Sequence, residues 1–297
     1  PLKDGPLRTQ QLASELGVDS GKLGPLLYAL VVAGLLTEQD GAFANTPETD
    51  AFLVRGRAGY LGETHKNWYS NLRATLKTPE TIRTGVAQAK YDWSSMDRGE
   101  LRTLYEGMAA GDVEFANSMS ERYDFSECKE LLDAGCGSGT FAIAMTQMHP
   151  HMTATVVDLP QVTPITEEFV LDADASRRVK VVPADLTCDP IPGMHDAGML
   201  SSVIQSLSAE HARKVIRNVG RAIKPGGWLY IVGGGMLKNS RLAPRSAVEW
   251  NLVFMNVYDG GQSYTEDEYR DWLGEAGFED LSFSYEDFTI TARKRAD

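Results

Sequence analysis

The chain has 297 residues, enough for more than one modest domain, and its 42% hydrophobic and 24% charged residues are ordinary for a globular protein. Its formal net charge of −12 argues against a nucleic-acid partner, since a phosphate backbone attracts Lys and Arg. No apolar run reaches the roughly 18 residues needed to span a membrane, and no secretory signal is recognisable. The cysteines lack metal-ligand spacing, so we expect reduced thiols in a cytoplasmic protein.

Residues 8–47 are predicted to form a small helical module. A short helix that stops at Gly17 is followed by a second helix over 21–32 and by a hairpin that turns at Asp40-Gly41. This order is the winged-helix pattern, which binds DNA in many proteins. The second helix offers only Lys22 as a basic residue, so we expect no DNA binding.

The character of the chain changes near residue 128. Residues 50–125 read as mostly helical, whereas short apolar runs then alternate with amphipathic stretches. The runs lie at 130–133, 155–158, 179–182, 197–200 and 228–232. Strands separated by helices predict an α/β fold with a doubly wound, Rossmann-like parallel sheet.

The strongest functional signal is a Gly-rich loop after the first of these strands. Residues 133–139 read Asp-Ala-Gly-Cys-Gly-Ser-Gly and lead into a helix over 141–148, so the glycines let the backbone approach a ligand closely. The loop alone is a weak signal, because dinucleotide enzymes use a similar one over a pyrophosphate. Asp133, however, would repel a pyrophosphate at the strand-loop junction and can serve an amino-acid cofactor.

Two further carboxylates follow the next strands. Asp158 ends the second strand, where it can accept hydrogen bonds from both ribose hydroxyls, or else cap a helix. Asp185 ends the third strand, where it can accept from an adenine amine, or else be an ordinary loop carboxylate. Together with Asp133 they indicate a cofactor that carries an adenosine and an amino-acid group.

Several ordered motifs extend this pattern along the chain. They lie at 133–139, 157–160, 184–186, 216–219, 224–227, 260–266 and 273–278. Over residues 8–294 they resemble the S-adenosylmethionine-dependent, small-molecule O-methyltransferases that form winged-helix dimers, a family with plant phenolic and bacterial polyketide enzymes.

The resemblance implies a class I methyltransferase fold in a homodimer. Residues 1–118 would be a mostly α-helical, winged-helix-like dimerisation domain with a linker, and residues 119–297 the Rossmann-like cofactor domain. S-adenosylmethionine would be converted to S-adenosylhomocysteine, without a metal, as a small-molecule substrate is methylated. The expected cofactor-binding residues are Asp133, Gly135, Gly137, Gly139, Asp158, Leu159, Asp185, Leu186 and Ser201.

The catalytic histidine of the family is missing. Gln205 stands in its place, and glutamine cannot take a proton near neutral pH. A general base contributes about 10²–10⁴ in rate, so its loss puts phenol methylation in doubt. His65 could replace it, because it lies in the linker that covers the pocket in this family, whereas His195 and His211 are expected at the surface. Alternatively, the enzyme no longer methylates, or its acceptor needs no base.

A thioether sulfur is an acceptor that needs no base, since it attacks with a lone pair and loses no proton. The enzyme then contributes proximity and desolvation, and aromatic faces stabilise the sulfonium. Residues 254–262 and the Gln205 segment resemble the methylthiohydroxybutyrate S-methyltransferases of bacterial dimethylsulfoniopropionate synthesis. This resemblance implies 4-methylthio-2-hydroxybutyrate as substrate and favours base-free S-methylation. The alternatives are O-methylation of a hydroxylated small molecule and a non-methylating enzyme that retains the cofactor.

Substrate residues are expected among the aromatic and basic side chains of the helices. Gln205 and Tyr105 would hold or shape the substrate without moving a proton. Aromatic and apolar contacts would come from Tyr69, Trp250, Phe254, Met255 and Tyr258, although helical aromatic residues also fill cores. Arg241 or Arg245 would bind a substrate carboxylate, unless both face solvent.

Overall fold

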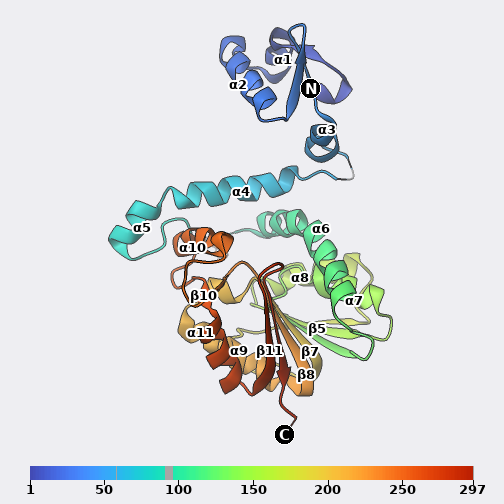
Figure 1. Ribbon diagram of the computed structural model, residues 1–297. Helices are drawn as coiled ribbons and strands as arrows, with labels where there is room; N and C mark the ends of the chain where they lie inside the picture. Colours follow the sequence, from blue (N-terminus) through green and yellow to red (C-terminus); the bar gives the residue numbers. More distant parts are fainter. Residues whose placement is uncertain (58, 91–95, 297) are drawn as a thin grey trace. The chain divides into compact units, whose positions relative to one another are not determined.

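The structure is a computed structural model that describes residues 1–57, 59–90 and 96–296, without the side chains of 63–68 and 110 (Figure 1). The chain forms two compact units, Pro1–Ser70 and Asn71–Asp297. Helix α4 (Gly62–Thr75) runs across the boundary between them. Among the described residues, no helix has the length and apolar character needed to cross a bilayer.

The first unit contains the two helices and the hairpin that the sequence predicts. Its elements are η1 (Leu2–Asp4), β1 (Leu7–Arg8), α1 (Thr9–Leu16), α2 (Ser20–Val32), β2 (Leu36–Gln39), β3 (Ala42–Asn45) and α3 (Pro47–Leu53). Gly17 ends α1 in the left-handed conformation, and the Asp19 side chain caps α2 by accepting from the Lys22 amide at 2.8 Å. A small core of Leu12, Leu27, Leu36 and Phe43 holds these elements together.

The second unit is built on a seven-stranded sheet in the order β11-β12-β8-β7-β4-β5-β6. The strands are β4 (Glu130–Ala134), β5 (Thr153–Asp158), β6 (Val179–Pro183), β7 (His195–Ser201), β8 (Ile223–Val232), β11 (Phe278–Ser284) and β12 (Thr289–Lys294). All five predicted strands are present and parallel, so the Rossmann-like fold is confirmed. The sheet is nevertheless mixed, because a short hairpin joins β11 to β12 and makes both antiparallel to their neighbours.

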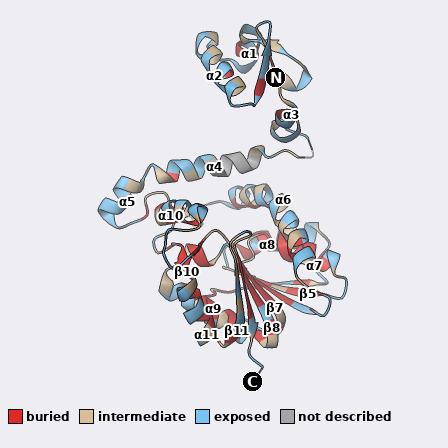
Figure 2. Ribbon diagram, in the orientation of Figure 1, coloured by how far each residue is buried: buried red, intermediate tan, exposed pale blue. Residues whose placement is uncertain are grey.

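Helices cover both faces of this sheet, and the buried residues concentrate in the strands and the facing helix sides (Figure 2). The helices of the second unit are α5 (Thr78–Thr84), α6 (Arg98–Arg122), α7 (Thr140–Met148), α8 (Thr163–Asp172), α9 (Ala209–Arg221), α10 (Arg245–Val257) and α11 (Glu266–Glu275), of which α5 packs on α10 instead of the sheet. Short elements η2 (Ile204–Ser206), β9 (Met236–Leu237) and β10 (Tyr264–Thr265) connect them. In α9, for example, Ala212, Val215, Ile216 and Val219 form one buried stripe at helical spacing.

Helix α6 brings part of the helical region predicted before residue 128 onto the sheet domain. It begins at Asp97 with a capping box, in which Asp97 accepts from the Glu100 amide and Glu100 from the Asp97 amide. Its buried residues Ala116 and Met119 share a core with α7 and the sheet. The expected domain division at residue 118 falls within α6, and the two compact units meet between residues 70 and 71.

Candidate functional site

A cavity of about 350 Å³ lies where β4, β5, β6 and β7 end. Ligands bind at the carboxyl ends of strands in such sheets, because the loops that follow parallel strands all leave from the same edge. Helix α6 contributes Tyr105, Met108, Asp112 and Phe115 to the opposite wall. Asp133, Asp158, Leu159, Asp185, Leu186 and Ser201, all predicted from the sequence, line the cavity as well.

The Gly-rich loop lines this cavity, and its glycines at 135 and 137 have no room for a side chain. Gly135 has a φ of 79°, and a Cβ there would lie 2.3 Å from Cγ2 of Val203. Gly137 has a φ of 54°, and a Cβ there would lie 2.7 Å from Cε1 of Tyr105. Gly139, also predicted to bind the cofactor, caps α7 instead and is absent from the cavity wall. These glycines therefore serve close packing as much as ligand access.

Asp158 ties the loop to the second strand. Its Oδ2 accepts from the Gly137 amide at 2.8 Å, and its Oδ1 accepts from the Leu159 amide at 2.7 Å. Burial raises the pKa of the Asp158 carboxyl, and these two amides oppose the shift. The alternative of a helix cap does not hold, because Val162 is the N-cap of the following helix.

Asp185 has the loop role that the sequence left open, and its adenine role stays a prediction. Its Oδ1 accepts from the amide and from the hydroxyl of Thr187, at 2.8 and 2.7 Å, which stabilises the loop after β6. The residue also lines the cavity. Both oxygens of a carboxylate can accept more than one hydrogen bond, so these contacts leave acceptor capacity toward a ligand.

Two carboxyl groups that line the cavity, Asp133 and Asp112, have raised pKa values because they are buried. Asp133 is 2% exposed, and its Oδ2 has no hydrogen-bond partner among the described residues. Burial, then repulsion from Asp112 and Asp158, raises the pKa of the Asp133 carboxyl to about 8. Burial also raises the pKa of the Asp112 carboxyl to about 6, and a hydrogen bond donated by the Ser138 hydroxyl opposes the shift. The cavity wall formed by the described residues has no Lys, Arg or His, so the site favours a cationic ligand.

The residues that sequence reasoning missed lie on the same face of α6 as Tyr105. Met108, Asp112 and Phe115 follow Tyr105 at intervals of three, seven and ten residues, which is one side of a helix. Helical spacing counted from Tyr105 would therefore have found them. Burial raises the pKa of the Tyr105 phenol, with a further contribution from Asp158, so Tyr105 stays protonated at neutral pH and is no base.

Gln205 does not line this cavity. It lies in η2, is 7% exposed, and packs against the turn after β8, where a Cβ at Gly233 or Gly235 would come within 2.9 Å of its side chain. Its neighbours Ser206 and Leu207 face the cavity instead.

Neither His195 nor His211 lies where it could act as a general base in the first cavity. His195 is buried, contrary to the expected surface position, because it begins β7 and its Nδ1 lies 3.0 Å from the Ala222 carbonyl oxygen, at the amino edge of the sheet. His211 is exposed on α9, as expected, and lines no cavity. The side chain of His65 lies outside the described residues.

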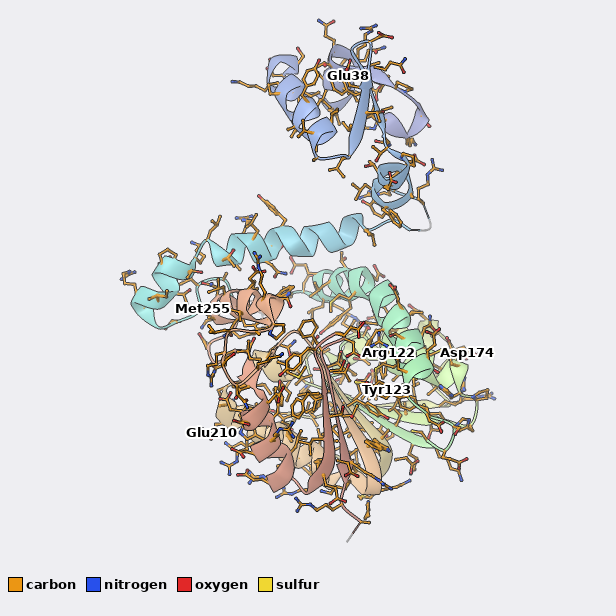
Figure 3. The ribbon with its side chains drawn as sticks, viewed as in Figure 1. Glu38, Arg122, Tyr123, Asp174, Glu210 and Met255 are labelled. Atoms are coloured by element: carbon orange, nitrogen blue, oxygen red, sulfur yellow. The ribbon has the colours of Figure 1, made fainter. Side chains whose placement is uncertain are left out.

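A second cavity, of about 680 Å³, lies between α5 and α10. Tyr258 lines both cavities, and Met255, which Figure 3 labels on α10, lines the second. Trp250 and Phe254 stack with ring centroids 5.8 Å apart, and Tyr258 continues the row at 6.5 Å from Phe254. Three of the predicted aromatic residues are thus adjacent, and the row reaches the first cavity at Tyr258.

The remaining predicted substrate residues lie elsewhere. Arg241 pairs with both carboxylate oxygens of Glu268 at 3.1 Å, and Arg245 pairs with Glu249 at 2.6 Å. Neither arginine lines either cavity, so the structure does not bring them to a substrate carboxylate. Tyr69 is 62% exposed on α4, within the first unit.

Comparison with known proteins places this site in context. The sequence pattern of the family described as "O-methyltransferase domain" matches residues 73–279. A 3-hydroxy-5-methyl-1-naphthoate 3-O-methyltransferase from Streptomyces sahachiroi is 29% identical over 290 residues, which are 93% of this chain and 81% of the relative. The tetracenomycin polyketide synthesis 8-O-methyl transferase TcmO from Streptomyces glaucescens is 26% identical over 94% of this chain and 84% of its own length.

Solved structures agree on the fold. An O-methyltransferase family protein from Burkholderia thailandensis superposes with a TM-score of 0.85 at 23% identity, over 98% of this chain and 89% of that protein. PigF with SAH (S-adenosylhomocysteine) also gives a TM-score of 0.85, at 21% identity, over 99% and 91% of the two chains.

Proposed function

The chain belongs to the O-methyltransferase domain family and is an S-adenosylmethionine-dependent methyltransferase, and on this premise we propose that it methylates a hydroxyl oxygen of a small aromatic molecule. The observation that carries the proposal is the similarity, over more than nine tenths of the chain, to two enzymes named as O-methyltransferases of a naphthoate and of a polyketide. Tyr258, which lines both cavities, supports a flat acceptor, since an aromatic ring is a favourable surface for another ring.

The first cavity fits the cofactor. Its volume of about 350 Å³ lies within the usual range for small-molecule sites, and its orphaned Asp133 oxygen matches an ammonium group. Asp158 would hold the ribose, and Asp185 with Leu186 the adenine. When bound, the cofactor supplies a methyl group on a positively charged sulfur.

The chain's own contribution to transfer is positioning and exclusion of water. Tyr105, Phe115 and Phe141 give the cavity an apolar wall, and Tyr258 lines both cavities. An acceptor held against Tyr258 would therefore lie next to the cofactor. Alignment of two reactants in this way is worth an effective concentration of about 10⁵ M or more.

The acceptor proton needs a destination, and His65 is the candidate base that we retain. Gln205 cannot take the proton, and no histidine whose side chain the structure describes lines the cavity. Because no described histidine lines the cavity, base-free S-methylation of 4-methylthio-2-hydroxybutyrate stays a second candidate. That reading is now the weaker one, because the two curated relatives described above act on oxygen.

The chain is also proposed to act as a homodimer, with its winged-helix-like N-terminal region in the contact. Apolar side chains at Leu72, Leu76 and Ile82 are 60%, 74% and 69% exposed, which is costly unless another surface covers them. Size-exclusion chromatography with light scattering measures the oligomer, and a monomer at micromolar concentration would contradict this assignment.

The experiment is a turnover assay with S-adenosylmethionine and two acceptor panels, hydroxylated aromatic molecules and thioether acids, in which release of S-adenosylhomocysteine is followed. We expect turnover on the hydroxyl panel. A rate that rises with pH and loses this dependence in His65→Ala would assign the base. Turnover confined to thioether acids, at a rate independent of pH, would replace oxygen with sulfur as the acceptor.

A further inference from the structure

The N-terminal half of α6 (residues 98–108) forms part of the first cavity's wall and also faces α8. Tyr105 and Met108 lie on the side of the helix that lines the cavity. Arg98 and Arg102, one helical turn apart, lie on the side that bonds α8. Because a single helix supplies this wall, its attachment to neighbouring elements decides how firmly the cavity is closed.

The apolar attachment of this half of α6 is small. Leu101 and Tyr105 pack with Val162 and Ile165 in a core of four buried residues. Val162 is the N-cap of α8, and Leu159 in the loop before it lines the cavity. The C-terminal half of α6, in contrast, shares the larger core with α7 and the sheet. The N-terminal half therefore depends on α8 for its position.

An ion-pair network of Arg98, Arg102, Glu106, Glu168 and Asp172 supplies a second attachment. Oε2 of Glu168 on α8 accepts from Nη1 of Arg102 at 2.6 Å, and its Oε1 accepts from Nε of Arg98. Arg102 also donates to Asp172 at 2.8 Å and to Glu106 at 2.9 Å. Glu168 is thus the one carboxylate of this network that joins both arginines of α6.

Glu168 is well suited to hold these two bonds. Hydrogen bonds from Arg102 and then Arg98 hold the pKa of the Glu168 carboxyl below its usual value, so the carboxylate is ionised at neutral pH. Its side chain is 22% exposed, less than either arginine, so water screens these bonds less than those of a fully exposed pair.

We propose that Glu168 is a positioning residue, which through Arg98 and Arg102 holds the N-terminal half of α6 against α8 and so retains the cofactor in the first cavity. The inference rests on the proposed function, because it takes S-adenosylmethionine and its product as the ligands of this cavity. Glu168 is absent from the described residues that line the cavity, so it acts through α6 and not by touching the ligand.

The product S-adenosylhomocysteine reports on this wall most directly. It carries one ammonium and one carboxylate and is neutral overall near pH 7, so its long-range attraction to the protein changes little with salt. Salt does weaken ion pairs that are partly exposed, as those of Glu168 are. A cavity wall held by these pairs should therefore release the product faster as the ionic strength rises.

The test measures the association and dissociation rates of S-adenosylhomocysteine by surface plasmon resonance, from about 0.02 to about 0.5 M salt. Glu168→Gln keeps the shape of the side chain and removes its charge. Glu275→Gln is the matched control, because Glu275 on α11 pairs with Arg213 on α9 at 2.5 and 2.6 Å and lines neither cavity. Urea unfolding of both variants shows that they are folded.

At the lowest salt concentration we expect dissociation to be about 3- to 10-fold faster in Glu168→Gln than in the wild type, with association unchanged within about twofold. Raising the salt should bring the wild-type rate toward that of the variant, a convergence that a purely structural role of Glu168 would not produce. Glu275→Gln should match the wild type.

Unchanged dissociation in Glu168→Gln, or equal acceleration in the control, would overturn the positioning role while leaving the methyltransferase intact. A wild type that does not bind S-adenosylhomocysteine would instead contradict the proposed function, and the role of Glu168 with it.

Discussion

Gly137→Ala is the substitution that tests the loop geometry most sharply. The backbone at Gly137 has a φ of 54°, and a left-handed conformation costs a residue with a Cβ about 1–2 kcal/mol. The new Cβ would lie 2.7 Å from Cε1 of Tyr105, about 1 Å closer than carbon atoms pack. Tyr105 cannot easily yield, since it is 8% exposed and packs with Leu101, Val162 and Ile165.

Overpacking of this kind costs about 1–3 kcal/mol, so we expect a total loss of about 2–5 kcal/mol in the free energy of unfolding. Urea unfolding followed by circular dichroism measures the loss, and calorimetry should show weaker binding of S-adenosylhomocysteine. Gly274→Ala is the matched control, because Gly274 lies in α11 with an ordinary φ and nothing within 4 Å of its Cβ position. If Gly137→Ala were as stable as this control and bound the ligand equally well, the close approach of Tyr105 to the loop would be refuted.

Two further predictions concern parts of the second unit away from the first cavity. Asn256→Ala removes a fully buried amide that bonds Thr81 at 2.6 Å and Thr78 at 2.9 Å. The free energy of unfolding in urea should therefore fall by about 1–3 kcal/mol. An unchanged unfolding midpoint would contradict the attachment of α5 to α10. Burial raises the pKa of Asp196, but hydrogen bonds from Lys224 and the Glu130 and Lys129 amides outweigh it and hold that pKa below its usual value. Its contribution is therefore present above about pH 4 and lost as pH falls further, and Asp196→Ala should lose less stability between pH 4 and pH 2 than the wild type does.

The fold could be predicted largely from local pattern. Strands such as Thr153–Asp158 have an apolar centre, and a parallel strand that is buried on both faces requires apolar residues wherever it occurs. The antiparallel edge was missed because β11 and β12 alternate less clearly, and Glu279 and Asp280 interrupt the first of them.

The candidate site could be predicted where it follows strands, and less well where helices complete it. Asp133, Asp158 and Asp185 sit at strand ends, whose meeting point is fixed by the parallel sheet. Asp112 lies within a long helix whose register against the sheet depends on the packing of Met119 and Ala116, which no local pattern specifies. For the same reason Arg241 and Arg245, adjacent in sequence to the aromatic row, turned out to pair with glutamates outside both cavities.

The most direct test of oxygen as the methyl acceptor is a competition followed by carbon-13 NMR. S-adenosylmethionine labelled in its methyl group would be offered, in one tube with the protein, a panel of hydroxylated aromatic acceptors and an equal amount of 4-methylthio-2-hydroxybutyrate. The chemical shift of the transferred carbon distinguishes a methyl ether from a methyl sulfonium. We predict that the label appears in methyl ethers; its appearance only in the sulfonium would contradict the proposed oxygen acceptor.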